Sequence, residues 1–312
     1  MAEALRAVLV APFADMVANP AFLIEVLLGG IASGLMYSLV ALGFVLIFKA
    51  SGVFNFAQGA LVLFSALTLV GLMERGAPVW LAIGLTMLVM VVLAFAIERV
   101  VLRPLVNQEA IILFMATIGL NFFLEGFGEM AWGANVKKLD IGIPDTSFVI
   151  RGVLVNRLEL TAAVTAAVLV TILAVFFQRT RIGRALRAVA DDHAAAMSVG
   201  IPLKTIWVIV WSVSGLVALV AGVMWGAKSG VQFSLSLIAL KALPVLILGG
   251  FTSVPGAIVG GLIIGVGEKM GEVYWGPLVG GAIENWFAYV VAMAFLVFRP
   301  QGLFGEKIIE RV

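Results

Sequence analysis

The chain has no cysteine and a single histidine, His193, among its 312 residues. Without cysteine it can form no disulfide bond, thiolate nucleophile or thiolate metal site. With one histidine it can form no metal site built from several histidines. The phosphate-binding pattern GxxxxGK[ST] is also absent, so the sequence offers no such loop for ATP. We therefore expect no metal site and no cofactor bound by this chain, and we do not expect an enzyme.

Charged residues are scarce as well. They make up 12% of the chain, against roughly 25% in soluble domains. Hydrophobic residues reach 62%, and the mean hydropathy is +1.15. A soluble domain of this size could not cover its surface with so few charges, whereas apolar runs of about 20 residues suit a bilayer. The composition predicts an all-α polytopic membrane protein, surrounded by lipid and with no nucleic acid among its partners.

Hydropathy predicts eight or nine transmembrane helices in a single domain that covers residues 1–312. This domain divides into a first helical group (21–127), an external loop (128–158) and a second helical group (159–312). The predicted spans are 22–48, 56–73, 79–97, 110–127, 159–177, 206–226, 235–250, 254–270 and 282–298.

Glycine pairs spaced four residues apart recur in these spans. Gly30/Gly34 and Gly261/Gly265 are two examples. Such pairs let helix backbones approach closely, so they predict a tightly packed bundle.

The placement of lysine and arginine predicts the side of the membrane on which each loop lies. The loop 179–204 is rich in arginine, which places it in the cytoplasm by the positive-inside rule. The segment 128–158 then lies outside. Within it, the alternating stretch "SFVIRGVLV" (147–155) predicts a small external hairpin.

Two segments interrupt the apolar runs with polar residues and glycines. "LIFKASGVFNFAQGALV" begins at Leu46, and "LPVLILGGFTSVPGAIV" begins at Leu243. At an offset of 197 residues the six identities between them are Leu46/Leu243, Gly52/Gly249, Phe54/Phe251, Gly59/Gly256, Ala60/Ala257 and Val62/Val259. Non-helical backbone survives in hydrocarbon only where protein or a water-filled cavity satisfies it. Paired interruptions in two halves of a chain therefore indicate a transport pathway, formed by helices broken at mid-membrane.

The predicted substrate pathway gathers the small and polar residues of both segments. Its members there are Asn55, Phe56, Gln58 and Gly59 in the first, and Thr252, Ser253 and Gly256 in the second. A helix that begins inside the membrane turns its free N–H groups and its positive dipole end toward whatever fills the cavity. The alternative is that both segments are ordinary loops, with glycines that make tight turns.

Two further polar residues inside predicted spans belong to this pathway prediction. Lys241 lies in "SLIALKALPVLI", and a charge at that depth has to face protein or water. It either contacts a substrate carboxylate or a partner subunit, or it snorkels or pairs with Glu125 or Glu268. Asn121 lies one turn before Glu125 and either lines a polar cavity or forms interhelical hydrogen bonds.

The cytoplasmic loop contains a predicted amphipathic helix. At helical spacing, one face gathers Ile182, Leu186, Val189 and Met197, and the other carries Arg184, Arg187 and Asp191. Pro202 closes the segment. Taken alone, such a helix could also lie on lipid headgroups, held there by its arginines.

Four stretches, in this order along the chain, resemble one family. They are "GLMYSLVALGFVLIFKASGVFNFAQGAL" (34–61), "RIGRALRAVADD" (181–192), "LGGFTSVPGAIVGGLIIG" (248–265) and "RPQGLFG" (299–305). They resemble the LivH-like permease subunits of branched-chain amino acid ABC importers. "AAAMSVG" (194–200) also resembles the Glu-Ala-Ala loop of importer permeases, with Ala194 in place of the glutamate.

The resemblance implies a set of partners and an inner-membrane location. Such a permease pairs with a second homologous permease and with two ATP-binding subunits, which carry ATP and Mg. A periplasmic solute-binding protein delivers the solute. The loop would be the coupling helix that docks on an ATPase. Its expected coupling residues are Arg184, Arg187, Asp191, Ala195, Ala196 and Gly200, and the last three of these match the family's pattern.

Other functions stay open on the sequence alone. An ATP-independent channel or facilitator could also use broken helices, but it would not need the arginine-rich loop. An intramembrane enzyme is disfavoured because the spans show no serine–histidine pair and no carboxylate pair at hydrolase spacing. A purely structural subunit would leave the paired interruptions unexplained. The resemblance implies branched-chain amino acids as the solute, although relatives carry other amino acids, amides, urea or aromatic acids.

Overall fold

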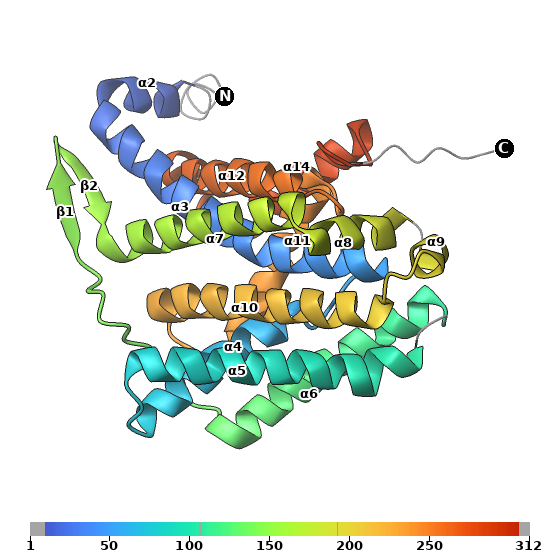
Figure 1. Ribbon diagram of the computed structural model, residues 1–312. Coiled ribbons are helices and arrows are strands. Elements are labelled where there is room, and N and C mark those ends of the chain that lie inside the picture. The colour runs from blue at the N-terminus through green and yellow to red at the C-terminus, as the bar shows by residue number, and fades with distance from the viewer. Residues whose placement is uncertain (1–9, 106–107, 192, 306–312) are drawn as a thin grey trace.

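Backbone amides that face lipid must find their hydrogen-bond partners within the protein, and this chain accordingly folds almost entirely into helices. The computed structural model describes residues 10–105, 108–191 and 193–305. The long helices run roughly side by side (Figure 1). This agrees with the predicted all-α polytopic architecture.

The helices of the first group are α2 (Ala11–Ala18), α3 (Pro20–Ser51), α4 (Gln58–Glu74), α5 (Val79–Ile97) and α6 (Ala110–Trp132). A π-helical turn, η1 (Glu98–Leu102), and a 3-10 turn, η2 (Arg103–Leu105), extend α5. Pro20 opens α3 at a position where its missing N–H costs nothing. Gly52 closes the same helix in the left-handed conformation, with φ 69°.

The second group begins with strands β1 (Ser147–Ile150) and β2 (Val153–Asn156), followed by α7 (Arg157–Arg179), α8 (Arg181–Asp191), α9 (His193–Ser198) and α10 (Leu203–Ser229). It continues with η3 (Phe233–Leu237), α11 (Ile238–Gly249), α12 (Val254–Met270), η4 (Gly271–Trp275), α13 (Gly276–Val279) and α14 (Ile283–Phe298). Each of the nine predicted spans contains a helix. In the described part of the chain, six helices are long and apolar enough to cross a membrane, and three shorter apolar ones are Gln58–Glu74, Phe233–Gly249 and Ile283–Phe298.

The two ends of the bundle differ. The strands lie at one end, which we call the hairpin end, and α8 and α9 lie at the other, the α8 end (Figure 1). The strands pair antiparallel, with Ser147 opposite Asn156, so the predicted hairpin is confirmed. Its two turn residues, Arg151 and Gly152, both have positive φ, at 52° and 85°. This is the combination that a two-residue type I′ turn requires.

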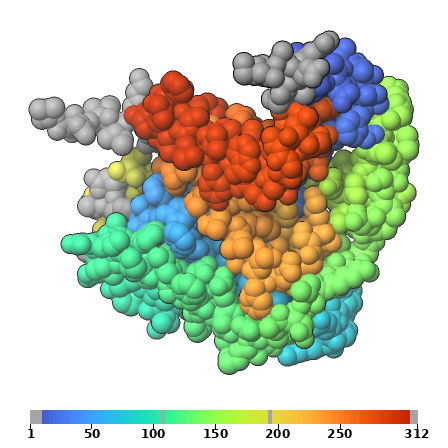
Figure 2. All heavy atoms as spheres, turned by 180° about the vertical axis from the view of Figure 1, so that it is seen from behind, coloured from blue at the N-terminus to red at the C-terminus, as the bar shows by residue number. Residues whose placement is uncertain are grey.

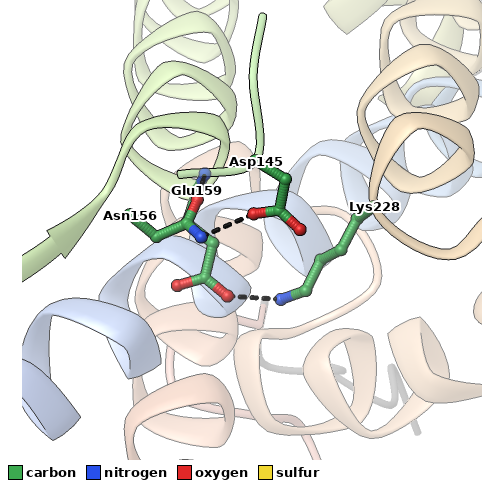
Figure 3. A network of polar contacts seen from close by, with 4 residues as sticks. All are labelled: Asp145, Asn156, Glu159 and Lys228. Carbon is green, nitrogen blue, oxygen red and sulfur yellow. Dashed lines mark hydrogen bonds and ion pairs between the residues drawn. The ribbon is translucent and has the colours of Figure 1, made fainter. Parts of the chain in front are cut away.

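A polar network fastens the hairpin to the bundle (Figure 3). Asn156 Nδ2 donates to Asp145 Oδ1 at 2.6 Å, and Asn156 Oδ1 accepts the Glu159 N–H at the start of α7. The Glu159 carboxylate pairs with Lys228 of α10 at 2.8 Å. The hairpin, α7 and α10 are therefore held together at this end.

Helix α3 forms the centre of the bundle. In its most apolar stretch 78% of the residues are buried, against 28% for α5 and 22% for α6, so the latter two lie at the outside of the bundle. The predicted glycine pairs meet on one seam, where Gly34 of α3 faces Gly261 and Gly265 of α12. On the face that is hidden in Figure 1, α11 (orange) lies at the surface between α14 (red) and α6 (green) (Figure 2).

The α3–α12 seam has no room for a methyl group, and this gives a first prediction. A Cβ on Gly34 would lie 2.6 Å from the Gly261 carbonyl oxygen, so Gly34→Ala should lower the free energy of unfolding by about 1–3 kcal/mol through overpacking. Gly84→Ala on α5 is the matched control, because nothing lies within 4 Å of its Cβ position. Thermal unfolding in detergent, followed by tryptophan fluorescence, measures both. Equal midpoints for the two variants would contradict the packing described here.

Candidate functional site

The connection between α3 and α4 turns back into the bundle. The chain leaves α3 at Gly52, and the first residue of α4 is Gln58. Gln58 Oε1 accepts a hydrogen bond of 2.8 Å from Ser214 Oγ, and Ser214 lies near the middle of α10 (Leu203–Ser229). Helix α4 thus begins part-way along the bundle, as the polar interruption predicts.

Buried side chains satisfy the backbone of this connection. Asn55 and Gln58 are both 0% exposed. Asn55 Oδ1 accepts the Ala57 N–H at 3.1 Å, and the Phe56 N–H donates to Thr117 Oγ1 of α6 at 3.1 Å. The predicted pathway residues Asn55 and Gln58 are therefore enclosed by protein, whereas the Phe56 side chain is 37% exposed.

Two glycines allow this arrangement. A Cβ on Gly43 of α3 would collide with the Gln58 side-chain amide, and a Cβ on Gly59 would collide with the Ser236 carbonyl. Ser236 belongs to η3, directly before α11. Helices α4 and α11 thus begin against each other at the same depth.

From this junction the two helices run in opposite directions. At the far end of α4, Glu74 pairs with Lys137 beyond α6, at the hairpin end. At the far end of α11, the carbonyl oxygens of Leu248 and Gly249 accept the N–H groups of Leu303 and Phe304. The C-terminal segment therefore caps α11 at the α8 end.

The second interruption lies elsewhere than predicted. We expected α12 to begin at mid-membrane, but the connection before it lies at the α8 end, where Thr252 O accepts Lys49 Nζ at 3.4 Å. Ser253 caps α12 by accepting the Gly256 N–H at 3.0 Å. The segment that covers this connection, 299–305, is remote in the sequence, so the local pattern could not reveal it. The helix of the second group that begins at mid-depth is α11.

The two similar segments nevertheless meet in space. The rings of Phe54 and Phe251 stand edge to face with centroids 6.4 Å apart, and Phe48 contacts Phe251 at 5.4 Å. Together with Phe56 and Leu243 these rings line an open apolar hollow.

A cavity of about 230 Å³ lies at the α8 end. Its wall includes Lys49 of α3, Arg187 of α8, and the predicted pathway residues Thr252 and Ser253. Basic and hydroxyl groups therefore meet beside the first turn of α12.

A second cavity, of about 320 Å³, opens at the hairpin end, and we call it the hairpin-end cavity. Its wall includes Tyr37 of α3, Lys241 of α11 and Glu268 of α12. Lys241 Nζ donates to the Glu284 carbonyl oxygen at 3.4 Å. Among the described residues it forms no ion pair with Glu125 or Glu268, which were the bridging alternatives.

The sequence did not single out Tyr37, Ser214 or Glu268 as site residues. For Glu268 the signal was present, since an ionisable residue within an apolar span marks a functional position. Asn121 is partly buried on α6, one turn beyond Thr117. As substrate contacts, Asn121 and the other pathway residues stay predictions.

Helix α8 packs tightly on the end of α7. Leu186 and Val189 are buried as predicted, and a Cβ on Gly183 would collide with the Phe177 carbonyl. Arg187 does not face away from the bundle, which corrects its predicted placement. Its guanidinium donates to the carbonyl oxygens of Phe177 at 2.7 Å and Gln178 at 3.4 Å, because the last carbonyls of a helix attract cations.

The remaining coupling candidates lie on or beside α8 and α9. Arg184, Asp191 and Ala195 are exposed, and Ala196 is buried. Met197 is 47% exposed and belongs to α9, a helix separate from α8, so the prediction that it shares one helix with Leu186 and Val189 was wrong. Gly200 closes α9 in the left-handed conformation, with φ 85°.

Comparison with known proteins gives a consistent set of matches. A family model described as "Branched-chain amino acid transport system / permease component" matches residues 26–299. The high-affinity branched-chain amino acid transport system permease protein BraD of Pseudomonas aeruginosa is 29% identical over 305 residues, which cover 93% of this chain and 98% of BraD. The LivH protein of Escherichia coli, with the same description, is 28% identical over 311 residues, with the same coverage.

Two more distant matches were also found. The fructose import permease protein FruG of Bifidobacterium longum is 22% identical, over 80% of this chain and 74% of FruG. A solved structure, PsaBC from Streptococcus pneumoniae in complex with Fab, matches with a TM-score of 0.47 and 15% identity, over 93% of this chain and 95% of the matched chain.

The buried amide of Gln58 gives a second prediction. Gln58→Leu removes the acceptor of the Ser214 hydroxyl and of the Asn55 amide, so the free energy of unfolding should fall by about 1–3 kcal/mol. The exposed Gln108→Leu is the control for the same change of side chain. Denaturation of the purified protein in detergent measures the difference. A Gln58→Leu variant as stable as the control would show that the amide is not needed at the helix start.

Arg184 and Arg187, two of the three arginines of α8, give a third prediction, because Arg187 bonds to two end carbonyls of α7 and Arg184 reaches only one, at 3.5 Å. Arg187→Met should lower the unfolding midpoint and expose the 177–183 junction to proteolysis, since two carbonyl groups lose a charged donor. Arg184→Met should leave the unfolding midpoint and the protease resistance of the junction unchanged, because Arg184 is exposed and reaches only the Arg179 carbonyl, at 3.5 Å. Limited proteolysis with thermal unfolding compares them. The opposite ranking would refute the capping role.

Proposed function

The chain belongs to the family of permease components of branched-chain amino acid transport systems, and on that premise we propose that it is the membrane-spanning permease subunit of an ATP-binding cassette importer. The observation that carries this proposal is the family match across residues 26–299. In this role the protein resides in the inner membrane. The hairpin end then faces outside and the α8 end faces the cytoplasm.

The proposed solute is a branched-chain amino acid. BraD and LivH, the relatives named for these solutes, match over 93% of the chain. FruG, which is named for fructose, is less similar, at 22% identity. The apolar rings beside the interrupted segments suit a small solute with an aliphatic part.

The proposed mechanism is alternating access driven by partner subunits. The chain has no phosphate-binding loop of its own, so two ATP-binding subunits with ATP and Mg would supply the energy. A solute-binding protein would deliver the solute to the hairpin end, and a second homologous permease would complete the pathway. Asn55, Phe56, Gln58, Gly59, Asn121, Lys241, Thr252, Ser253 and Gly256 would line or support this pathway.

The arrangement of the two cavities supports this mechanism. One opens at each end of the bundle, and their walls share no residue. Between their levels lies the buried start of α4, with Asn55 and Gln58 at 0% exposure. Alternating access requires a cavity on each side of such a barrier, with only one of the two open to the pathway at a time.

Helices α8 and α9 are the proposed coupling element. Gly183 and Arg187 fix α8 to α7, so a push on α8 reaches the membrane helices. The exposed Arg184, Asp191 and Ala195 would contact the ATP-binding subunit, with Ala196 and Gly200 shaping the loop.

The fourth prediction tests coupling in the transporter reconstituted with its ATP-binding subunits and solute-binding protein. Arg184→Glu should reduce solute uptake at least about tenfold, because reversing a charge at a docking surface costs several kcal/mol, while the permease stays folded. ATP hydrolysis should no longer respond to the loaded binding protein. Arg184→Lys, which keeps the positive charge at the same exposed position, is the matched control and should retain uptake.

Gly200 provides a second test of the same contact. Gly200→Trp should also uncouple uptake from hydrolysis, since a large side chain disfavours positive φ and would project from the loop. Gly200→Asn should retain more uptake, because asparagine tolerates this conformation. Wild-type uptake in both Arg184→Glu and Gly200→Trp would remove the coupling assignment.

A further inference from the structure

The hairpin-end cavity holds opposite charges that do not pair with each other. It is walled by residues of α3, α10, α11, α12 and the segment before α11, and by Glu284 of α14. Its volume, about 320 Å³, lies at the small end of the range for ligand pockets. Lys241 and Glu268 lie in this wall, yet they form no ion pair.

Glu268 is a buried acid with an unused oxygen. The residue is 4% exposed, within α12. Its Oε1 atom is buried and has no hydrogen-bond partner among the described residues, and Tyr37 lies in the same cavity wall. A carboxylate at this depth is costly unless a cation or a hydrogen-bond donor satisfies it. No described residue donates a hydrogen bond to this oxygen, so the donor has to come from another molecule.

Lys241 has spare donors on the same wall. An ammonium group has three N–H donors, and here one reaches the Glu284 carbonyl oxygen at 3.4 Å. Among the described residues it has no ion-pair partner. Lys228, a second cation of the wall, is already paired with Glu159 at 2.8 Å. Lys269, a third lysine of the wall, likewise forms no ion pair among the described residues, so Lys241 and Lys269 are the cations that remain available to an anionic group.

Apolar surface lies beside these two charges. Trp225, Leu235 and Ile238 belong to the same wall. A ligand that fits the cavity therefore needs one anionic group, one cationic group that donates hydrogen bonds, and a compact apolar part.

We propose that the hairpin-end cavity binds the zwitterion of a free aliphatic amino acid. Lys241 takes the α-carboxylate, Glu268 takes the α-ammonium group, and Ile238 and Trp225 contact the side chain. This inference rests on the proposed transport function and adds to it a binding site within the permease itself. A solute released at the hairpin end would be held there by its backbone charges, which all amino acids share.

The fifth prediction tests this site by calorimetric titration. The assembled transporter in nanodiscs, with the solute-binding protein left out, is titrated with L-leucine. Lys241→Met and Glu268→Gln should each weaken binding about tenfold or more, as expected when one charged hydrogen-bond partner is lost. Lys138→Met and Glu129→Gln, exposed residues outside the cavity, are the controls and should bind like the wild type.

Two analogues of leucine, each lacking one charged group, test which residue binds which group. L-leucinamide has no carboxylate, so it should bind equally to the wild type and to Lys241→Met. 4-Methylpentanoate has no ammonium group, so it should bind equally to the wild type and to Glu268→Gln. Equal losses for leucine and for both analogues in each variant would overturn the assignment of charges to groups.

The proposal falls if the wild type does not bind L-leucine, or if both cavity variants bind it like the wild type. Wild-type binding by Glu268→Gln alone would overturn the assignment of the α-ammonium group to Glu268. The same preparation, supplied with the binding protein, reports ATP-dependent uptake and so tests the proposed function separately. If uptake depends on ATP and the titrations fail, only the permease-held binding site is lost.

Discussion

A chain that leaves helical geometry between membrane helices must satisfy its own backbone within the protein, and the α3–α4 connection depends on this requirement. Asn55 and Thr117 accept the N–H groups of Ala57 and Phe56, and Gln58 bonds to Ser214. Each of these bonds contributes only about 1 kcal/mol net, but each unmade one would cost more in lipid. The polar residues that interrupt the apolar sequence are therefore what permits α4 to begin at mid-depth.

The same requirement explains why α3 is both central and rich in small residues. Its backbone is approached closely from two directions, by the Gln58 side chain at Gly43 and by α12 at Gly34. Membrane helices gain little from excluding water, so close backbone packing has to supply the association energy. The outer helices α5 and α6 are less constrained, and Gly84 and Gly119 there have no neighbour within 4 Å of a Cβ position.

The sequence predicts a structural feature well when neighbouring residues determine it, and poorly when contacts with distant parts of the chain determine it. Hydropathy located α5 at Val79–Ile97 and α12 at Val254–Met270 with both bounds correct, and the alternation in 147–155 predicted the hairpin. A short apolar run, however, looks the same whether it begins at the surface or at mid-depth, so the start of α11 was missed. The helical face of Arg187 was also misjudged, because its acceptors are carbonyls at the end of a different helix.

The position of α8 explains how a chain without a phosphate-binding loop could respond to an external energy source. Gly183, Leu186 and Arg187 belong to the wall of the α8-end cavity, together with Thr252 and Ser253 at the start of α12. A displacement of α8 would therefore change the shape of this cavity directly, without a chain of intermediate contacts. The α4–α11 junction, whose close packing rests on Gly59 against the Ser236 carbonyl, lies beyond that cavity at mid-depth. In the proposed mechanism, a displacement that begins at α8 would therefore act on the α8-end cavity first and on the α4–α11 junction after it.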